Sequence, residues 1–205
     1  GFDNAPTAQA DLIGSGSAVF ASGEYIEVGD VGTVKTLTFW FKPTAQIASG
    51  TAAKSLFWFQ DHGSDKYYGV QTGSSTGVIS GEILAVLPDG STRSGTNTTL
   101  EAGVWHHFAI VWDESNASAK HYAIYTDGVL TTDLRAGNHT RADWDSFRIG
   151  KDGGTYDTAV GNIAQVGIWS TSISQEQIQS ISQKTYSELT TSEKTNLVSW
   201  WGLDA

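Results

Sequence analysis

The sequence contains no cysteine and no methionine, and only 3 of its 205 residues are proline. Without cysteine, the chain has neither a disulfide framework nor thiolate chemistry. Because a chain without methionine cannot begin at its own start codon, we expect a processed or excised part of a longer protein. All-β sandwiches of about this length often form one unit, so we expect a single domain over residues 1–205 with a loose N-terminal segment, 1–17.

Positive charge and long apolar runs are also scarce. Twelve Lys and Arg residues stand against 22 Asp and Glu residues, a net charge of −10 that repels nucleic acid and anionic lipid. No apolar run approaches the roughly 18 residues that a membrane-spanning helix needs. We therefore expect no nucleic-acid partner and no membrane span, whereas cations and neutral ligands such as sugars are compatible with this composition.

What the chain does contain is glycine and tryptophan, with 23 and 8 copies, which is typical of strands joined by tight turns. In "TLTFWFKP" (36–43), Leu37, Phe39 and Phe41 alternate with Thr38, Trp40 and Lys42, the period of a β-strand. The same pattern predicts further strands over 54–60, 66–71, 81–87, 147–150 and 160–169.

Two local signals add a hairpin and a helix. The dipeptide Asp127-Gly128, inside "KHYAIYTDGVLTTD", suits the positive φ angles of a type I′ turn. In "TSISQEQIQSIS" (171–182), Ser174 and Gln177 have the spacing of a capping box, which predicts a helix of about two turns.

Adjacent histidines, His106 and His107, lie in the apolar stretch "GVWHHFAIVWD" (103–113). On a strand they point to opposite faces, so they cannot chelate one ion together. We expect His107 to have a structural role, and His106 to be the better candidate for contact with a ligand.

The segments "LEAGVWHHFAIVWD…AIYTDGVL" and "FRIG…GNIAQVGIWSTSISQEQI", together with "TLTFWFKP", resemble the laminin G-like, concanavalin A-like lectin/glucanase superfamily. The resemblance covers residues 18–181, and it implies an all-β jelly-roll sandwich of two antiparallel sheets with a short helix near the C-terminus. Function would then be carried by rim loops or by the concave face. The sequence departs from the family at Ala164 and Gln165, where many members have an Asp-Glu pair, so these carboxylates are not present for a cation contact.

Glucanases of this superfamily place catalytic carboxylates along one strand face, and a retaining pair lies about 5 to 5.5 Å apart. Glu24 and Glu27 are three residues apart and would face opposite ways on a strand. The pair Asp143 and Asp145 flanks Trp144 before a strand and is interpreted as a turn. We therefore predict that the chain is not an enzyme.

Two loops combine acidic and aromatic residues, "FQDHGSDKYYG" and "GKDGGTYDTAVG". Acidic oxygens at close spacing suit Ca²⁺, and aromatic rings suit a sugar face. Laminin G-like relatives place Ca²⁺ at a rim formed by equivalent loops, so the two loops could meet in space. The predicted ligand-binding residues are Asp61, His62, Tyr67, Tyr68, Tyr156 and His106, and the predicted Ca²⁺ ligands are Asp61, Asp65, Asp152 and Asp157. The alternative is that these are ordinary turn residues.

The tail "NLVSWWGLDA" ends the chain with two adjacent tryptophans. Residues 197–205 either close this sandwich, antiparallel to "NIAQVGIW", or begin a following module.

Three functional hypotheses follow. The first is a non-catalytic carbohydrate-binding or adhesion module, with a glycan or cell-surface ligand, in a larger extracellular, cell-surface or virion protein with neighbouring domains. The second is a structural module for protein contacts, and the third is a glycoside hydrolase or lyase.

Overall fold

The computed structural model describes residues 16–45, 53–61, 66–73, 82–86, 93–95, 100–113, 120–136, 144–151 and 157–203. At 61, 66–68, 82–86, 93–95, 113, 120–122 and 133–136 only the backbone is described.

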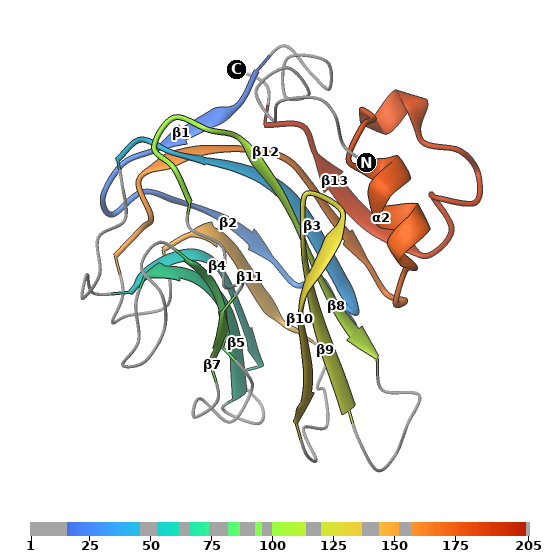
Figure 1. Ribbon diagram of the computed structural model, residues 1–205. Helices are drawn as coiled ribbons and strands as arrows, with labels where there is room; N and C mark the ends of the chain where they lie inside the picture. Colours follow the sequence, from blue (N-terminus) through green and yellow to red (C-terminus); the bar gives the residue numbers. More distant parts are fainter. Residues whose placement is uncertain are drawn as a thin grey trace.

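Within these residues the chain forms two antiparallel sheets packed face to face (Figure 1). The strands of the seven-stranded sheet are β1 (Ala18–Phe20), β3 (Thr36–Pro43), β8 (His106–Asp113), β9 (Lys120–Thr126), β10 (Val129–Ala136), β12 (Gly161–Trp169) and β13 (Leu197–Trp201). Their order is β1-β12-β3-β8-β9-β10, and β13 also pairs with β12. The predicted two-sheet sandwich is confirmed.

The strands of the six-stranded sheet are β2 (Tyr25–Gly29), β4 (Lys54–Asp61), β5 (Lys66–Gly73), β6 (Glu82–Val86), β7 (Arg93–Gly95) and β11 (Ser146–Gly150). Their order is β2-β11-β4-β5-β6-β7. Figure 1 shows both sheets curved in the same sense, with the six-stranded sheet on the inner side of the curve.

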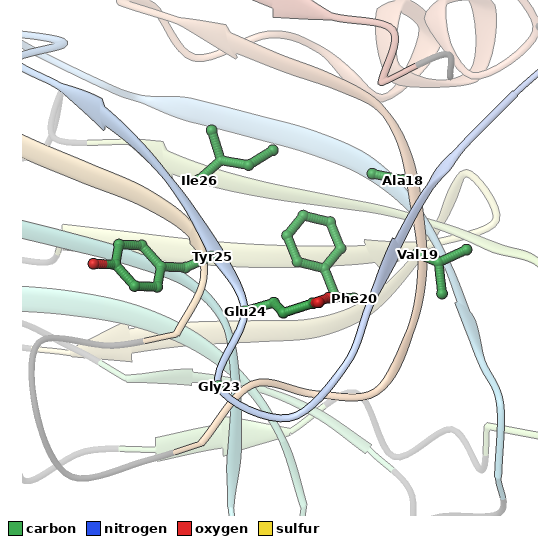
Figure 2. Close-up of a pocket in the computed structure, with 7 residues that line it drawn as sticks. All are labelled: Ala18, Val19, Phe20, Gly23, Glu24, Tyr25 and Ile26. Carbon is green, nitrogen blue, oxygen red and sulfur yellow. The ribbon is translucent and has the colours of Figure 1, made fainter.

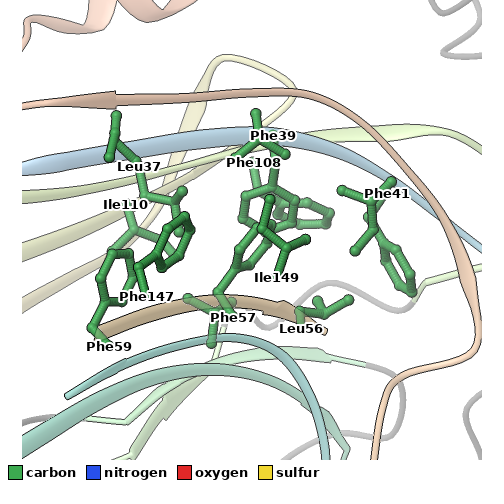
Figure 3. Packing of buried hydrophobic residues seen from close by; sticks show 14 of the residues in the cluster. Leu37, Phe39, Phe41, Leu56, Phe57, Phe59, Phe108, Ile110, Phe147 and Ile149 are labelled. Carbon is green, nitrogen blue, oxygen red and sulfur yellow. The ribbon is translucent and has the colours of Figure 1, made fainter. Parts of the chain in front are cut away.

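The main core lies between the sheets, where the inward faces of β3 and β8 meet those of β4 and β11 (Figure 3). The predicted alternation in β3 is confirmed, because Leu37, Phe39 and Phe41 belong to this core. Across the sandwich, the ring centroids of Phe39 and Phe57 are 4.5 Å apart. The sheets are therefore joined by aromatic packing, which buries large apolar areas per residue.

A helix covers the outer face of the seven-stranded sheet. The helix is α2 (Gln175–Ile181), and its capping box of Ser174 and Gln177 is present as predicted. Its buried residues Ile178 and Ile181 pack with Ala109 and Val111 of β8 in a second apolar cluster. In the part of the chain that the structure describes, no helix packs on the outer face of the six-stranded sheet (Figure 1).

The strand containing the two histidines alternates as predicted. Phe108, Ile110 and Trp112 face the main core, whereas Ala109 and Val111 face the helix. The hairpin prediction is also confirmed, since Asp127 and Gly128 both have positive φ, 50° and 76°.

The tail forms β13 and pairs antiparallel with β12, with Trp200 opposite Gly167 and Trp201 opposite Val166. The pairing expected for closure of the sandwich is therefore present. Trp201 packs against the main core and Trp200 against the cluster under the helix. Three short strands, β1, β2 and β7, were not predicted from the sequence.

Candidate functional site

Four residues of different types lie side by side across the strands on the outer face of the six-stranded sheet. Their positions follow from the core, because Phe147 and Ile149 of β11 and Phe57 and Phe59 of β4 point inward. Alternation then turns the residues between them outward. The row is in register across four strands, and its members are Glu27 (β2), Arg148 (β11), Trp58 (β4) and Gly69 (β5).

Arg148 and Glu27 form an ion pair at the β2 end of this row. The Arg148 Nε group donates to Glu27 Oε2 at 2.5 Å, and the Ser146 hydroxyl donates to Glu27 Oε1 at 3.2 Å. The two side chains remain 28% and 45% exposed. The Nη groups of Arg148 make no hydrogen bond to another described residue, so the pair presents donors as well as carboxylate lone pairs to solvent.

Tyr25 adds an aromatic surface beside the ion pair. The Arg148 guanidinium lies over its ring at 5.3 Å from the centroid, and Tyr25 is 50% exposed. Tyr25 stands opposite Gly150 in the ladder between β2 and β11. Gly150 has φ +106°, and a Cβ there would lie 2.6 Å from the Glu24 carbonyl oxygen. Glycine at this position therefore lets the two strands approach closely enough to form the Tyr25–Glu27–Arg148 cluster.

Trp58 forms the floor next to this cluster. It is only 8% exposed, and a Cβ at Gly69 would lie 3.1 Å from its ring. Gly69 thus leaves room for the indole to lie along β5. Because its ring is covered, Trp58 supports the surface, and among the described side chains of this face Tyr25 is the aromatic one that a ligand can reach.

One polar pair is buried on the same face. Ser55 and Gln71 stand opposite each other in the ladder between β4 and β5, and both are fully buried. The Ser55 hydroxyl and both amide atoms of Gln71 lack a hydrogen-bond partner. Unsatisfied buried polar groups destabilise a fold, so this pair lowers the stability of the sheet.

Asp157, from the second predicted loop, adjoins the Tyr25 end of the sheet. Its carboxylate accepts hydrogen bonds from the Ser22 hydroxyl and the Thr158 amide, and it pairs with Lys54 at 3.2 Å. These contacts, the Ser22 hydroxyl first, hold the pKa of Asp157 well below its usual range. The charged Asp157 carboxylate therefore links two parts of the chain, the start of β4 and the turn that connects β1 with β2.

Asp61 and Asp157, the described acidic residues of the two predicted loops, lie at opposite ends of β4. Asp61 ends β4, whereas the Asp157 carbonyl accepts from the Ser55 amide at the start of the same strand. Seven residues of extended chain span roughly 20 Å. Asp61 and Asp157 therefore lie far apart along β4, because β11 runs antiparallel to β4 and ends beside its start.

The structure describes only some of the other predicted loop residues. His62, Asp65, Asp152 and Tyr156 lie outside the described residues. Tyr67 and Tyr68 lie in β5, opposite Gln60 and Phe59, with only their backbones described. No three His, Asp or Glu side chains gather as a metal site among the described residues. Calcium stays a prediction, which melting curves in Ca²⁺ and in EDTA would test.

The two histidines belong to the other sheet. His107 is buried and packs edge-on against Trp40 at 5.4 Å, and burial lowers its pKa to about 4 although Asp127 raises it. The structural role predicted for His107 is confirmed. His106 Nδ1 contacts Asp127 Oδ2 at 2.8 Å, and the other oxygen of Asp127 accepts from the His107 amide. His106 therefore fixes the hairpin turn, and its role as a ligand contact stays a prediction.

The family departure at Ala164 and Gln165 also has a structural use. Ala164 packs with Trp40 and Trp105, and Gln165 is 4% exposed. The Gln165 amide oxygen accepts from the Trp200 indole at 2.9 Å. Gln165 thus holds the tail against β12.

A hollow of about 470 Å³ lies between β1 and β2. Its lining includes Val19, Phe20 and Ile26. Figure 2 shows the Tyr25 ring projecting away from Phe20, on the other side of β2. Most of its lining is apolar, but Glu24 and Tyr25 also line it, so the hollow adjoins the Tyr25–Glu27–Arg148 cluster. Val19 and Ile26 leave 65% and 38% of their surface exposed.

Sequence reasoning missed Tyr25, Glu27 and Arg148. A signal was present in "YIEVG", where Tyr25 and Glu27 alternate with Ile26 and Val28, but the stretch is short. None of the helices among the described residues is long and apolar enough to cross a membrane.

Comparison with solved structures finds the same fold in several proteins. Domain 4 of AbnA, a GH43 extracellular arabinanase from Geobacillus stearothermophilus, solved with arabinotriose, is 18% identical with a TM-score of 0.58, over 82% of this chain and 76% of that one. The Ruminococcus gnavus IT-sialidase CBM40, bound to α2,3-sialyllactose, is 14% identical with a TM-score of 0.60, over 82% and 97%.

A third structure, a putative carbohydrate binding protein from Bacteroides ovatus ATCC 8483, is 16% identical with a TM-score of 0.64, over 92% of this chain and 51% of that one. Comparison with curated proteins gives no match. At these identities the structures show the fold alone. The family profile described as the concanavalin A-like lectin/glucanases superfamily matches residues 15–179. The chain therefore belongs to this superfamily.

Proposed function

We propose that the chain is a non-catalytic carbohydrate-binding module that binds glycans on the outer face of its six-stranded sheet. The observation that carries the proposal is the Tyr25–Glu27–Arg148 cluster, in which an exposed ring adjoins an exposed ion pair. Sugars present apolar C–H faces and hydroxyl groups, which match an aromatic surface and fixed polar groups respectively. The similar folds solved with arabinotriose and sialyllactose support the same function.

The arrangement of the two sheets also supports this face. Helix α2 occupies the outer side of the seven-stranded sheet, so that surface is used for packing. The six-stranded sheet lies on the inner side of the curve (Figure 1). Concave surfaces bury more of a small ligand than flat ones do.

The carboxylates near the cluster do not support hydrolysis. Glu27 is held by Arg148 and Ser146, and Glu24 Oε2 accepts from the Ala21 amide at 2.8 Å. Both carboxylates are thus engaged by donors of the chain itself, whereas a general acid must be within hydrogen-bond reach of the leaving-group oxygen of its substrate. We therefore propose binding without catalysis, in a module of a larger extracellular, cell-surface or virion protein.

A second candidate function, protein contact, is favoured by the apolar hollow between β1 and β2. Its exposed Val19 and Ile26 would suit an apolar side chain of a partner. Val19 lies on β1, outside the Tyr25–Glu27–Arg148 cluster, so the two functions can be tested apart at this residue.

A glycan array tests the first proposal, with Tyr25→Ala compared against Tyr186→Ala. Tyr186 is 52% exposed and lies against Lys194, as Tyr25 lies against Arg148, but it belongs to the 3₁₀ helix η1 (Tyr186–Glu188). The two changes thus remove similar rings from different surfaces. We expect Tyr25→Ala to weaken binding to the array hits about tenfold, because it removes the aromatic contact, and Tyr186→Ala to leave binding unchanged.

Both variants should melt close to the unmodified chain, since neither ring is buried. Absence of any hit on a broad array would contradict carbohydrate binding. Equal losses in the two variants would show that the Tyr25 ring is not the ligand surface.

A further inference from the structure

We infer that the Tyr25–Glu27–Arg148 cluster selects neutral sugars with adjacent hydroxyl groups and rejects carboxylated or sulfated ones. This inference rests on the proposed function and concerns the ligand class of the same site.

The charge around the cluster is mainly negative. On β2 and β11 and the residues that flank them, the described carboxylates are Glu24, Glu27, Asp30 and Asp145, and the described cations are Arg148 and Lys151. The four negative charges outnumber the two positive ones. The whole chain carries −10 as well. An anionic sugar would therefore approach a surface of its own sign.

Arg148 already has a counter-ion within the protein. Arginine binds a carboxylate most strongly through two parallel N–H groups. Here Glu27 already accepts from Nε at 2.5 Å and supplies the counter-charge. A ligand carboxylate at the Nη groups would be drawn close to the Glu27 carboxylate, where the two like charges repel each other.

The Arg148–Glu27 ion pair offers hydrogen-bond donors and acceptors to a neutral sugar. The Arg148 Nη groups supply donors, and Glu27 supplies charged acceptor oxygens beside them. Adjacent sugar hydroxyls can accept from the guanidinium through one oxygen and donate to the carboxylate through the next. Such hydrogen bonds to charged groups are stronger than neutral ones, and the Tyr25 ring at 5.3 Å from the guanidinium gives the sugar ring an apolar face to lie on.

The test compares Glu27→Gln with the unmodified chain on an array of neutral and carboxylated oligosaccharides, including arabinotriose, lactose and α2,3-sialyllactose. Glutamine keeps an acceptor for Arg148 and Ser146 but removes the negative charge, so Arg148 becomes an uncompensated cation. The control is Glu188→Gln, which makes the same charge change in η1, where glutamine can still cap Thr185.

We expect neutral hits for the unmodified chain, and a shift of about tenfold or more toward carboxylated glycans in Glu27→Gln. Glu188→Gln should keep the neutral preference. Tight binding of carboxylated glycans by the unmodified chain would overturn the inference and leave carbohydrate binding intact. A preference that does not change in Glu27→Gln would overturn it too. The absence of all hits would contradict the proposed function itself.

Discussion

At the residue scale, His107 shows how a titratable side chain serves packing. It is 2% exposed, and its Nδ1 atom has no hydrogen-bond partner. Desolvation disfavours the charged imidazolium, so the pKa falls from 6.5 to about 4 despite the nearby Asp127 carboxylate. The ring is neutral at pH 7 and acts as a planar group against Trp40.

This depressed pKa predicts acid sensitivity with a defined sign. Between pH 6.5 and 4 the unfolded chain binds a proton at His107 that the folded chain excludes, so stability falls as the pH falls. From pH 7.5 to 5 the unmodified chain should lose on the order of 2 kcal/mol at this residue. Urea unfolding at both pH values measures the loss.

His107→Phe is the matched variant, because phenylalanine keeps a planar ring and cannot be protonated. Its loss of stability between the two pH values should be smaller by that amount. If both proteins lose the same stability, then His107 is not buried and neutral as described.

A second residue, Glu193, is buried near the C-terminus yet stays charged. Burial alone would raise its pKa, but hydrogen bonds from Lys184, the Thr190 amide and Ser180 lower it to about 2. Its contribution is present above pH 4.5 and is lost only toward pH 2, so it does not confound the comparison at His107.

At the element scale, β13 is the strand whose role is most open to test. Its two tryptophans point to opposite sides of the sheet. The ring centroid of Trp201 lies 5.7 Å from that of Phe147, and the ring centroid of Trp200 lies 6.0 Å from that of Trp169. Gly167 makes room for this, because a Cβ there would lie 2.7 Å from both the Trp169 and the Trp200 rings.

Deleting residues 197–205 should therefore leave an insoluble or strongly destabilised domain. Burial of one tryptophan contributes on the order of 2 to 3 kcal/mol, and the strand also supplies backbone hydrogen bonds to β12. Thermal melting of the truncated chain measures the effect. A truncated protein that melts like the full chain would show that the tail belongs to a following module.

The elements also show what sequence could and could not predict. Strand β3, the hairpin and the helix cap depend on neighbours within a few residues, so period two, Asp127-Gly128 and Ser174 with Gln177 predicted them correctly. The ion pair was not predicted because Glu27 and Arg148 are 121 residues apart. For the same reason the sequence could not show that Asp61 and Asp157 lie at opposite ends of β4, because this depends on the direction of β11 beside β4, which no local pattern contains.

At the scale of the whole molecule, the two sheets have different outer faces. The outer face of the seven-stranded sheet is packed under α2, and that of the six-stranded sheet presents the Tyr25–Glu27–Arg148 cluster on β2 and β11. A glycan that binds as proposed should therefore touch the six-stranded sheet and leave the helix side unchanged. The His106 and Asp127 contact at the hairpin lies in the other sheet, so it provides an internal reference for this test.

The most direct measurement is a titration of the ¹⁵N-labelled chain with the strongest neutral glycan from the array, followed by amide chemical shifts. The account predicts shift changes at Tyr25, Glu27 and Arg148 and at their neighbours on β4, with none on α2 or at Asp127. Changes confined to α2, η1 or the hairpin at Asp127 would contradict it, because they would place the ligand on the opposite sheet.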